Sequence, residues 1–165
     1  MVGYPELLGI HIVAGIAGLL LGPVLAWADA RRWRRSRDLG AWYLGIVVAV
    51  AITAIGLVIW KRTDLWWLVP VSLLTVALAV LGRYATGRPG GWTHVYVHGL
   101  GGSYIALVTA TVVVAFALDG PLYGPWELVA WLAPTVLLAP LLEVWRQQPH
   151  CHRQVIAGRP GPVEA

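Results

Sequence analysis

Charged side chains are scarce in this sequence of 165 residues. Only 12% of the residues are Asp, Glu, Lys or Arg, and 58% are hydrophobic, whereas ordinary globular domains carry roughly 25% charged residues. A soluble domain of this length surrounds its core with a polar shell, and this chain has too few polar residues to build one. The composition therefore excludes an ordinary soluble fold and favours a protein whose surface faces lipid.

Cysteine is nearly absent as well. Cys151 stands alone, so an intrachain disulfide framework is excluded. The sequence also lacks a Walker-type phosphate loop, a Gly-x-Ser-x-Gly elbow and a Cys-x-x-Cys pair. The net charge of +4 does not indicate a nucleic-acid partner. The arginines cluster beside apolar runs and do not form a basic surface interleaved with aromatic residues.

What the sequence has instead is long apolar runs. Five of them predict an all-α bundle that crosses a bilayer about five times, because a run of about 18 apolar residues can span the hydrocarbon core. They cover Leu7–Ala28, Leu39–Trp60, Leu65–Leu81, Val95–Leu118 and Leu128–Trp145. Pro134 and Pro140 predict a bend in the fifth run. We expect residues 1–146 to form the bundle and the polar residues 147–165 to form a disordered cytoplasmic tail.

Basic residues divide unequally between the two ends of the predicted bundle. If the spans alternate in direction, ten of the twelve basic residues lie at one end, and only Lys61 and Arg62 lie at the other. The positive-inside rule then predicts an external N-terminus and a cytoplasmic C-terminus in a multi-pass protein of the plasma membrane. Most of the ten tryptophans flank the ends of the spans, which is typical of interfacial anchors.

Ionisable residues at membrane depth are few, and most are predicted to meet at the cytoplasmic end. The topology places Asp29, His94, His98 and Glu143 there. His94 and His98 are four residues apart and share one helix face. Two imidazoles at that spacing can bind one metal ion, with a carboxylate from another helix as a further ligand. The same groups could serve as proton donors and acceptors, or could simply hydrogen-bond loops and lipid head groups.

His11 is the exception, since it lies about 10 Å from the bilayer centre toward the opposite face. Gly15, Gly18 and Gly22 follow it along one stripe of the helix. Such a stripe allows another helix to approach closely, or makes room for a haem with His11 as an axial ligand. His98 is about 20 Å away in depth, so one haem cannot join the two histidines, and two separate sites would be needed.

Three stretches resemble a group of small bacterial predicted integral membrane proteins of about this length. They are His11-x3-Gly15-x6-Gly22-Pro23 in the first span, Gly102-Ser103-Tyr104-Ile105-Ala106 in the fourth, and Trp131-Leu132-Ala133-Pro134-Thr135 in the fifth. The resemblance extends from His11 to Trp145. It implies a helical bundle and draws attention to His11 and His98, and it implies no particular activity.

Three functions remain open from the sequence. The first is a membrane-embedded redox protein that binds a transition metal ion or haem, through His94, His98, Glu143 and Asp29 at the cytoplasmic end or through His11 and His98 as haem ligands. The second is a metal-free membrane enzyme acting on a lipid-like substrate. The third is a non-catalytic subunit of a larger membrane complex. The expected partners are the bilayer and either other membrane subunits or further copies of the chain.

Overall fold

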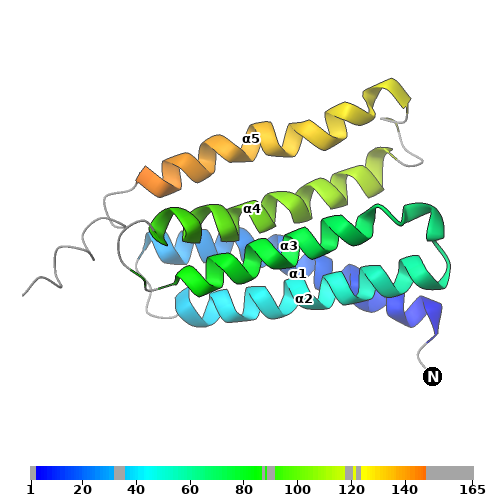
Figure 1. The fold of residues 1–165 in the computed structure, drawn as a ribbon, viewed down its shortest axis with the longest axis horizontal. Helices are drawn as coiled ribbons and strands as arrows, with labels where there is room; N and C mark the ends of the chain where they lie inside the picture. Colours follow the sequence, from blue (N-terminus) through cyan, green and yellow to red (C-terminus); the bar gives the residue numbers. More distant parts are fainter. Residues whose placement is uncertain are drawn as a thin grey trace, which may run out of the picture.

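The computed structural model describes residues 3–31, 36–86, 88, 92–117, 121 and 124–147. Across these residues the chain is helical and contains no strand. The elements are α1 (Tyr4–Ala30), α2 (Ser36–Trp60), η1 (Thr63–Leu65), α3 (Leu68–Ala85), α4 (Trp92–Val112), η2 (Val113–Ala117), η3 (Gly124–Trp126) and α5 (Glu127–Gln147) (Figure 1). Five of these helices are long and apolar enough to cross a membrane. The prediction of an all-α bundle with five candidate spans is confirmed.

The third span begins and ends later in the structure than predicted. Leu65 belongs to the short 3-10 helix η1, and α3 begins three residues later, at Leu68. Pro70 is then the third residue of α3, where its missing N–H would have no partner within the helix. At the other end α3 continues to Ala85 rather than Leu81. The predicted tail from residue 148 onward lies outside the described residues.

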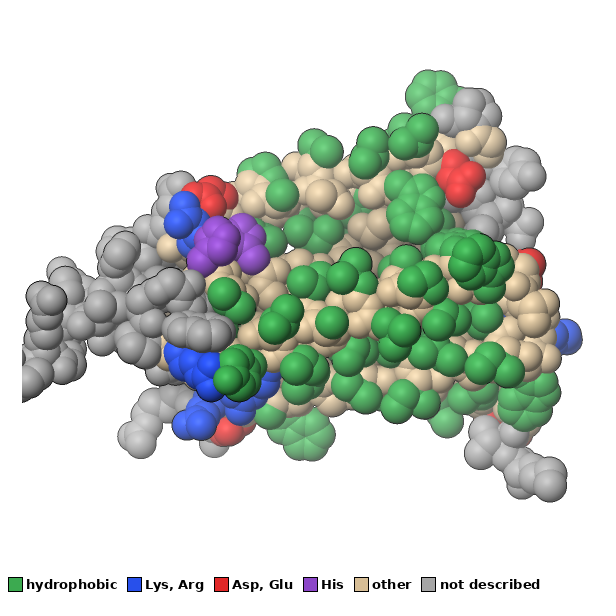
Figure 2. Space-filling view, in the orientation of Figure 1, with side chains coloured by type: hydrophobic (Ala, Val, Ile, Leu, Met, Phe, Trp, Pro, Cys, Tyr) green, Lys and Arg blue, Asp and Glu red, His purple; other side chains and the backbone are tan. Residues whose placement is uncertain are grey.

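The helices pack in chain order, each against the next. α1 also returns to contact α4, so that α1 to α4 enclose a common interior, and α5 lies against α4 (Figure 1). Large apolar side chains are exposed on the outer surface, including Val13, Leu20, Ile52, Leu137 and Val144. On the face shown in Figure 2, hydrophobic side chains extend along most of the bundle. A soluble monomer rarely exposes contiguous apolar surface on this scale. The middle of the bundle therefore suits contact with lipid.

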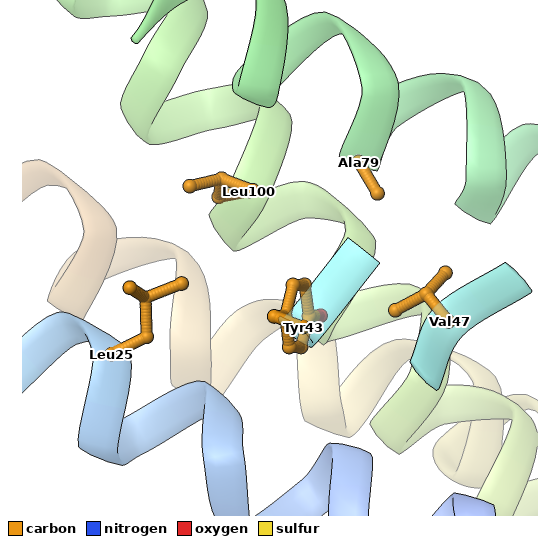
Figure 3. Close-up of a cluster of buried hydrophobic side chains, with 5 residues drawn as sticks. All are labelled: Leu25, Tyr43, Val47, Ala79 and Leu100. Atoms are coloured by element: carbon orange, nitrogen blue, oxygen red, sulfur yellow. The ribbon is translucent and has the colours of Figure 1, made fainter. Parts of the chain in front are cut away.

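One buried cluster of the interior lies toward the end of the bundle that carries most of the arginines. Leu25, Tyr43, Val47, Ala79 and Leu100 pack together there, and each of the first four long helices contributes to this cluster (Figure 3). The hydroxyl of Tyr43 is bonded to Ser103 Oγ at 3.1 Å. The hydroxyl of Ser103 in turn donates to the carbonyl of Leu100 at 2.7 Å, so these buried polar groups are satisfied.

Two glycines bring α3 and α4 into backbone contact. A Cβ atom added to Gly82 would lie 2.5 Å from the backbone nitrogen of Leu100, and one added to Gly99 would lie equally close to the nitrogen of Gly82. Membrane helices associate largely through such close packing, since lipid provides no hydrophobic drive between them. These two positions fix the pairing of α3 with α4.

Candidate functional site

A cavity of about 300 Å³ lies between α1, α2, α3 and the end of α4, in the half of the bundle that contains His11. Its walls are mostly aliphatic, with a few polar side chains among them. They comprise His11, Ile12, Gly15, Ile16 and Leu19 from α1; Val47, Val50, Ala51 and Ala54 from α2; Leu68, Val71, Ser72 and Thr75 from α3; and Leu107, Ala110, Thr111, Val114 and Ala115 from α4 and η2. Small-molecule sites are typically concave, largely apolar and about 300–1,000 Å³ in volume.

The glycine stripe of α1 explains where this cavity begins. A Cβ atom on Gly22 would collide with the ring of Tyr104, and one on Gly18 would lie 2.9 Å from Leu107. At Gly15, by contrast, an added Cβ meets nothing within 4 Å. Thus Gly18 and Gly22 serve close packing of α1 on α4, whereas Gly15 borders open space. Close helix packing is therefore the role of Gly18 and Gly22, and the open space beside Gly15 is part of the cavity.

His11 is held against α2 by one edge of its ring. Its Nδ1 lies 2.9 Å from Oγ1 of Thr53. The hydroxyl of Thr53 itself donates to the carbonyls of Ala49 at 2.8 Å and Val50 at 3.0 Å. Because its only proton is committed to these carbonyls, Oγ1 accepts the bond from a protonated Nδ1. The neutral ring then carries an unprotonated Nε2.

The His11 ring reaches the wall of the cavity. His11 is a lining residue whereas Thr53 is not, and with Nδ1 bonded to Thr53 the ring nitrogen left for a ligand is Nε2. An unprotonated Nε2 accepts a hydrogen bond or ligates a metal. The sequence indicated His11, but it did not indicate Thr53, which fixes the tautomer.

The three hydroxyl groups in the cavity wall differ in their availability. Thr75 donates to the carbonyl of Val71 at 2.7 Å, and Thr111 donates to the carbonyl of Leu107 at 2.9 Å. Both bonds stay within their own helices. Within the described part of the chain, Ser72 has no such bond. Its hydroxyl can therefore act as donor or acceptor toward a molecule in the cavity.

The end of α4 contributes an irregular segment to the same wall. Residues 113–117 form the π-helix η2, two residues of which, Val114 and Ala115, line the cavity. π-helical turns are rare, and they occur frequently at functional sites because the extra residue redirects side chains and frees backbone groups. No feature of the sequence predicted this turn.

His94, His98 and Glu143 lie near one another at the opposite end of the bundle. Figure 2 shows histidine side chains beside acidic and basic ones at this end. The rings of His94 and His98 are 4.1 Å apart between centroids. The Nε2 atom of His98 is buried and has no hydrogen-bond partner among the described residues. Glu143, however, accepts two hydrogen bonds from Arg146, one of them from Nε at 2.7 Å. The carboxylate nearest to the histidines therefore already has a cationic partner.

Asp29 has a different neighbour. Its carboxylate accepts a hydrogen bond from Nε1 of Trp145 at 3.3 Å, which links the end of α1 to the end of α5. Within the described residues, no three His, Cys, Asp or Glu side chains come close enough to hold a metal ion. His94 and His98 are brought together, but Glu143 and Asp29 do not complete a ligand set around them.

No family model matches the chain, and neither the curated proteins nor the solved structures include a match. The site must therefore be interpreted from its own geometry.

Proposed function

We propose that this protein binds a lipid-soluble small molecule within the membrane, in the cavity between α1 and α4, with His11 as the principal polar contact. The observation that carries this proposal is a fixed imidazole at the wall of an apolar cavity of about 300 Å³. An ionisable residue inside a membrane bundle is costly and generally functional. A ring oriented by a neighbouring hydroxyl is ready to accept a bond.

Co-purification with matched variants tests this proposal. Gly15→Leu should fill the cavity, since nothing lies within 4 Å of an added Cβ at that position. Gly45→Leu is the control, because Gly45 has the same free space and is not part of the cavity wall. We expect an apolar compound in organic extracts of the wild type and of Gly45→Leu, detected by mass spectrometry, and its loss from Gly15→Leu. Equal yields from all three proteins would refute the proposal.

A metal- or haem-binding function is a second candidate, favoured by the unpartnered Nε2 of His98 beside the ring of His94. Such a site needs a further ligand, which a rotation of Arg146 away from Glu143 would release. His11 could instead ligate haem iron through Nε2, since metal-bound histidines commonly donate their other N–H to a fixed acceptor. An optical spectrum and metal analysis of the purified protein and of His98→Ala and His11→Ala test both arrangements. Absence of a stoichiometric metal or haem removes this candidate.

We also propose that the arginine-rich end of the bundle faces the cytoplasm of a plasma-membrane protein. Arg31, Arg37, Arg83, Arg88 and Arg146 all lie at helix ends on this side, whereas Lys61 and Arg62 lie at the other. Positive charge next to membrane spans is retained on the cytoplasmic side. His11 and its cavity would then occupy the outer half of the bilayer.

A further inference from the structure

The polar groups of the His11 cavity restrict the chemistry of its ligand. This step rests on the proposed function, since it takes the cavity as the binding site. Nε2 of His11 is an acceptor because Nδ1 carries the proton that Thr53 accepts. A ligand that only accepts hydrogen bonds, such as an ester or a ketone, gains nothing from an unprotonated Nε2. The ligand must present an O–H or N–H donor to this atom.

A second polar contact is available on the other side of the cavity. Ser72 belongs to α3 and His11 to α1, and the two are separated by the aliphatic walls that α2 and α4 contribute. Thr75 and Thr111 are already bonded within their own helices. The oxygens of Thr75 and Thr111 can still accept, as that of Thr53 does, but Ser72 keeps a hydroxyl proton to donate, so the cavity offers this donor across an apolar space from His11. A complementary ligand has a flat or compact apolar body with a polar group at each of two opposite positions.

We infer that the ligand belongs to the hydroquinone class, with one phenolic hydroxyl donating to Nε2 of His11 and the opposite oxygen bonded to the hydroxyl of Ser72. A phenol is a stronger donor than an aliphatic alcohol because its proton is more acidic, with a pKa of about 10. The ring fits a largely aliphatic cavity of about 300 Å³. Long-chain alcohols and sterols also donate one hydroxyl, but they provide no second polar group for Ser72.

Binding measurements on the full chain in nanodiscs test this assignment. The probes are decylhydroquinone under anaerobic conditions, its dimethyl ether, decylbenzoquinone and dodecanol, and the readout is isothermal titration calorimetry. The hydroquinone should bind about tenfold more tightly than the ether or the quinone, which is the effect of about one well-placed hydrogen bond. His11→Phe should remove this preference while binding of the ether changes little, and Ser72→Ala should weaken the hydroquinone selectively.

The outcomes distinguish failure of the hydroquinone assignment from failure of the proposed binding function. If hydroquinone, ether and dodecanol bind equally and Gly15→Leu abolishes binding of all three, the cavity binds lipid-soluble molecules and the hydroquinone assignment is wrong. If no probe binds, or if Gly15→Leu binds every probe as well as Gly45→Leu does, both proposals fail.

Should His11→Phe be poorly folded, Thr53→Val provides the second variant, because it leaves the ring in place and removes the acceptor that fixes its tautomer. Retention of the full tenfold preference in Thr53→Val would overturn the assignment.

Discussion

Oγ1 of Thr53 accepts a hydrogen bond from Nδ1 of His11 across the interface between α1 and α2, at 2.9 Å. Thr53 is buried, whereas His11 is only partly buried and lines the cavity. A threonine hydroxyl that donates to a carbonyl of its own helix normally affects only that helix. Here it decides which nitrogen of the histidine is available to a ligand.

Replacing Thr53 by valine should change the tautomer of His11 while preserving the shape of the site. Valine has nearly the same volume but no acceptor, so the proton on Nδ1 loses its bond to the Thr53 hydroxyl. We expect the ring to populate the form protonated at Nε2, which nitrogen-15 NMR of histidine-labelled protein can measure directly. An unchanged Nδ1–H tautomer in Thr53→Val would contradict the assigned hydrogen bond. Thr111→Val is the control, since Thr111 bonds only to its own helix.

The helices could be predicted from the sequence, but the directions in which their faces point could not. Apolar runs of about 18–25 residues identify spans by length alone. These helices are apolar on nearly all sides, because lipid and neighbouring helices both accept apolar residues. The periodic contrast that marks the buried face of a soluble helix is therefore missing. As a result, the sequence indicated His11 and Gly15 but not that Thr53 of α2 faces them.

Pairings at the arginine-rich end were also only partly predictable. The four-residue spacing of His94 and His98 indicated their shared face, and their rings do lie side by side. Arg146 follows Glu143 by three residues, a spacing that favours an ion pair within one helix, and this pair occupies the carboxylate that the sequence suggests as a metal ligand. The bond between Asp29 and Trp145 joins residues 116 positions apart, which no local pattern reveals.

Gly82 should tolerate no side chain, because its neighbour is backbone. A methyl group at Gly82 would lie 2.5 Å from the nitrogen of Leu100, so α3 and α4 would have to separate. We expect Gly82→Ala to destabilise the protein by about 1–3 kcal/mol, the usual range for overpacking a core. Gly102→Ala is the matched control. Its added methyl would make ordinary contacts at 3.5 Å or more, and it should be neutral or stabilising by up to about 1 kcal/mol through helix propensity.

Unfolding by graded denaturant in detergent, followed by far-ultraviolet circular dichroism, measures both variants. The difference between them is the informative quantity, since both replace glycine by alanine within a long helix. Equal stability of Gly82→Ala and Gly102→Ala would show that α3 and α4 are not in backbone contact.

The hydrogen bond between Tyr43 and Ser103 should contribute modestly to stability. Ser103 donates to the carbonyl of Leu100, so its oxygen accepts from the phenol of Tyr43. Removal of one such bond typically costs about 0.5–1.5 kcal/mol. In a double-mutant cycle of Tyr43→Phe and Ser103→Ala, we expect a coupling energy of about 0.6 kcal/mol and at most about 1.7, as found for bonds between membrane helices. Strictly additive single effects would show that the two hydroxyls are not bonded.

Asp64 lies outside the spans, and its titration reports on Arg62. The guanidinium of Arg62 donates to both carboxylate oxygens, from Nε at 3.2 Å and from Nη2 at 3.1 Å, and these bonds lower the pKa of Asp64 below its ordinary value. A lowered folded-state pKa means that any stabilisation is present above the unfolded pKa and is lost as the pH falls through the folded one. Arg62→Gln should therefore raise the pKa of Asp64, measured by carbon-13 NMR of the carboxyl group.

Lys61→Gln provides the charge-matched control for that titration. It also removes one positive charge, but the ammonium of Lys61 lies over the ring of Tyr4 at 5.2 Å from its centroid and is not bonded to Asp64. The pKa of Asp64 should change little in this variant. A similar rise in both variants would mean that general charge, rather than the bonds from Arg62, sets the titration.

The single cysteine provides a direct test of orientation. Cys151 follows the last residue of α5 by four positions and lies outside the described residues. If the arginine-rich end is cytoplasmic, a membrane-impermeant maleimide should leave Cys151 unlabelled in intact cells and should label it after permeabilisation. Cys151→Ser with a new cysteine at Asp64, which lies between α2 and α3 at the opposite end, should label in intact cells. The reverse pattern in both proteins would mean that the arginine-rich end is external. His11 and its cavity, which lie in the other half of the bundle, would then occupy the cytoplasmic half of the bilayer.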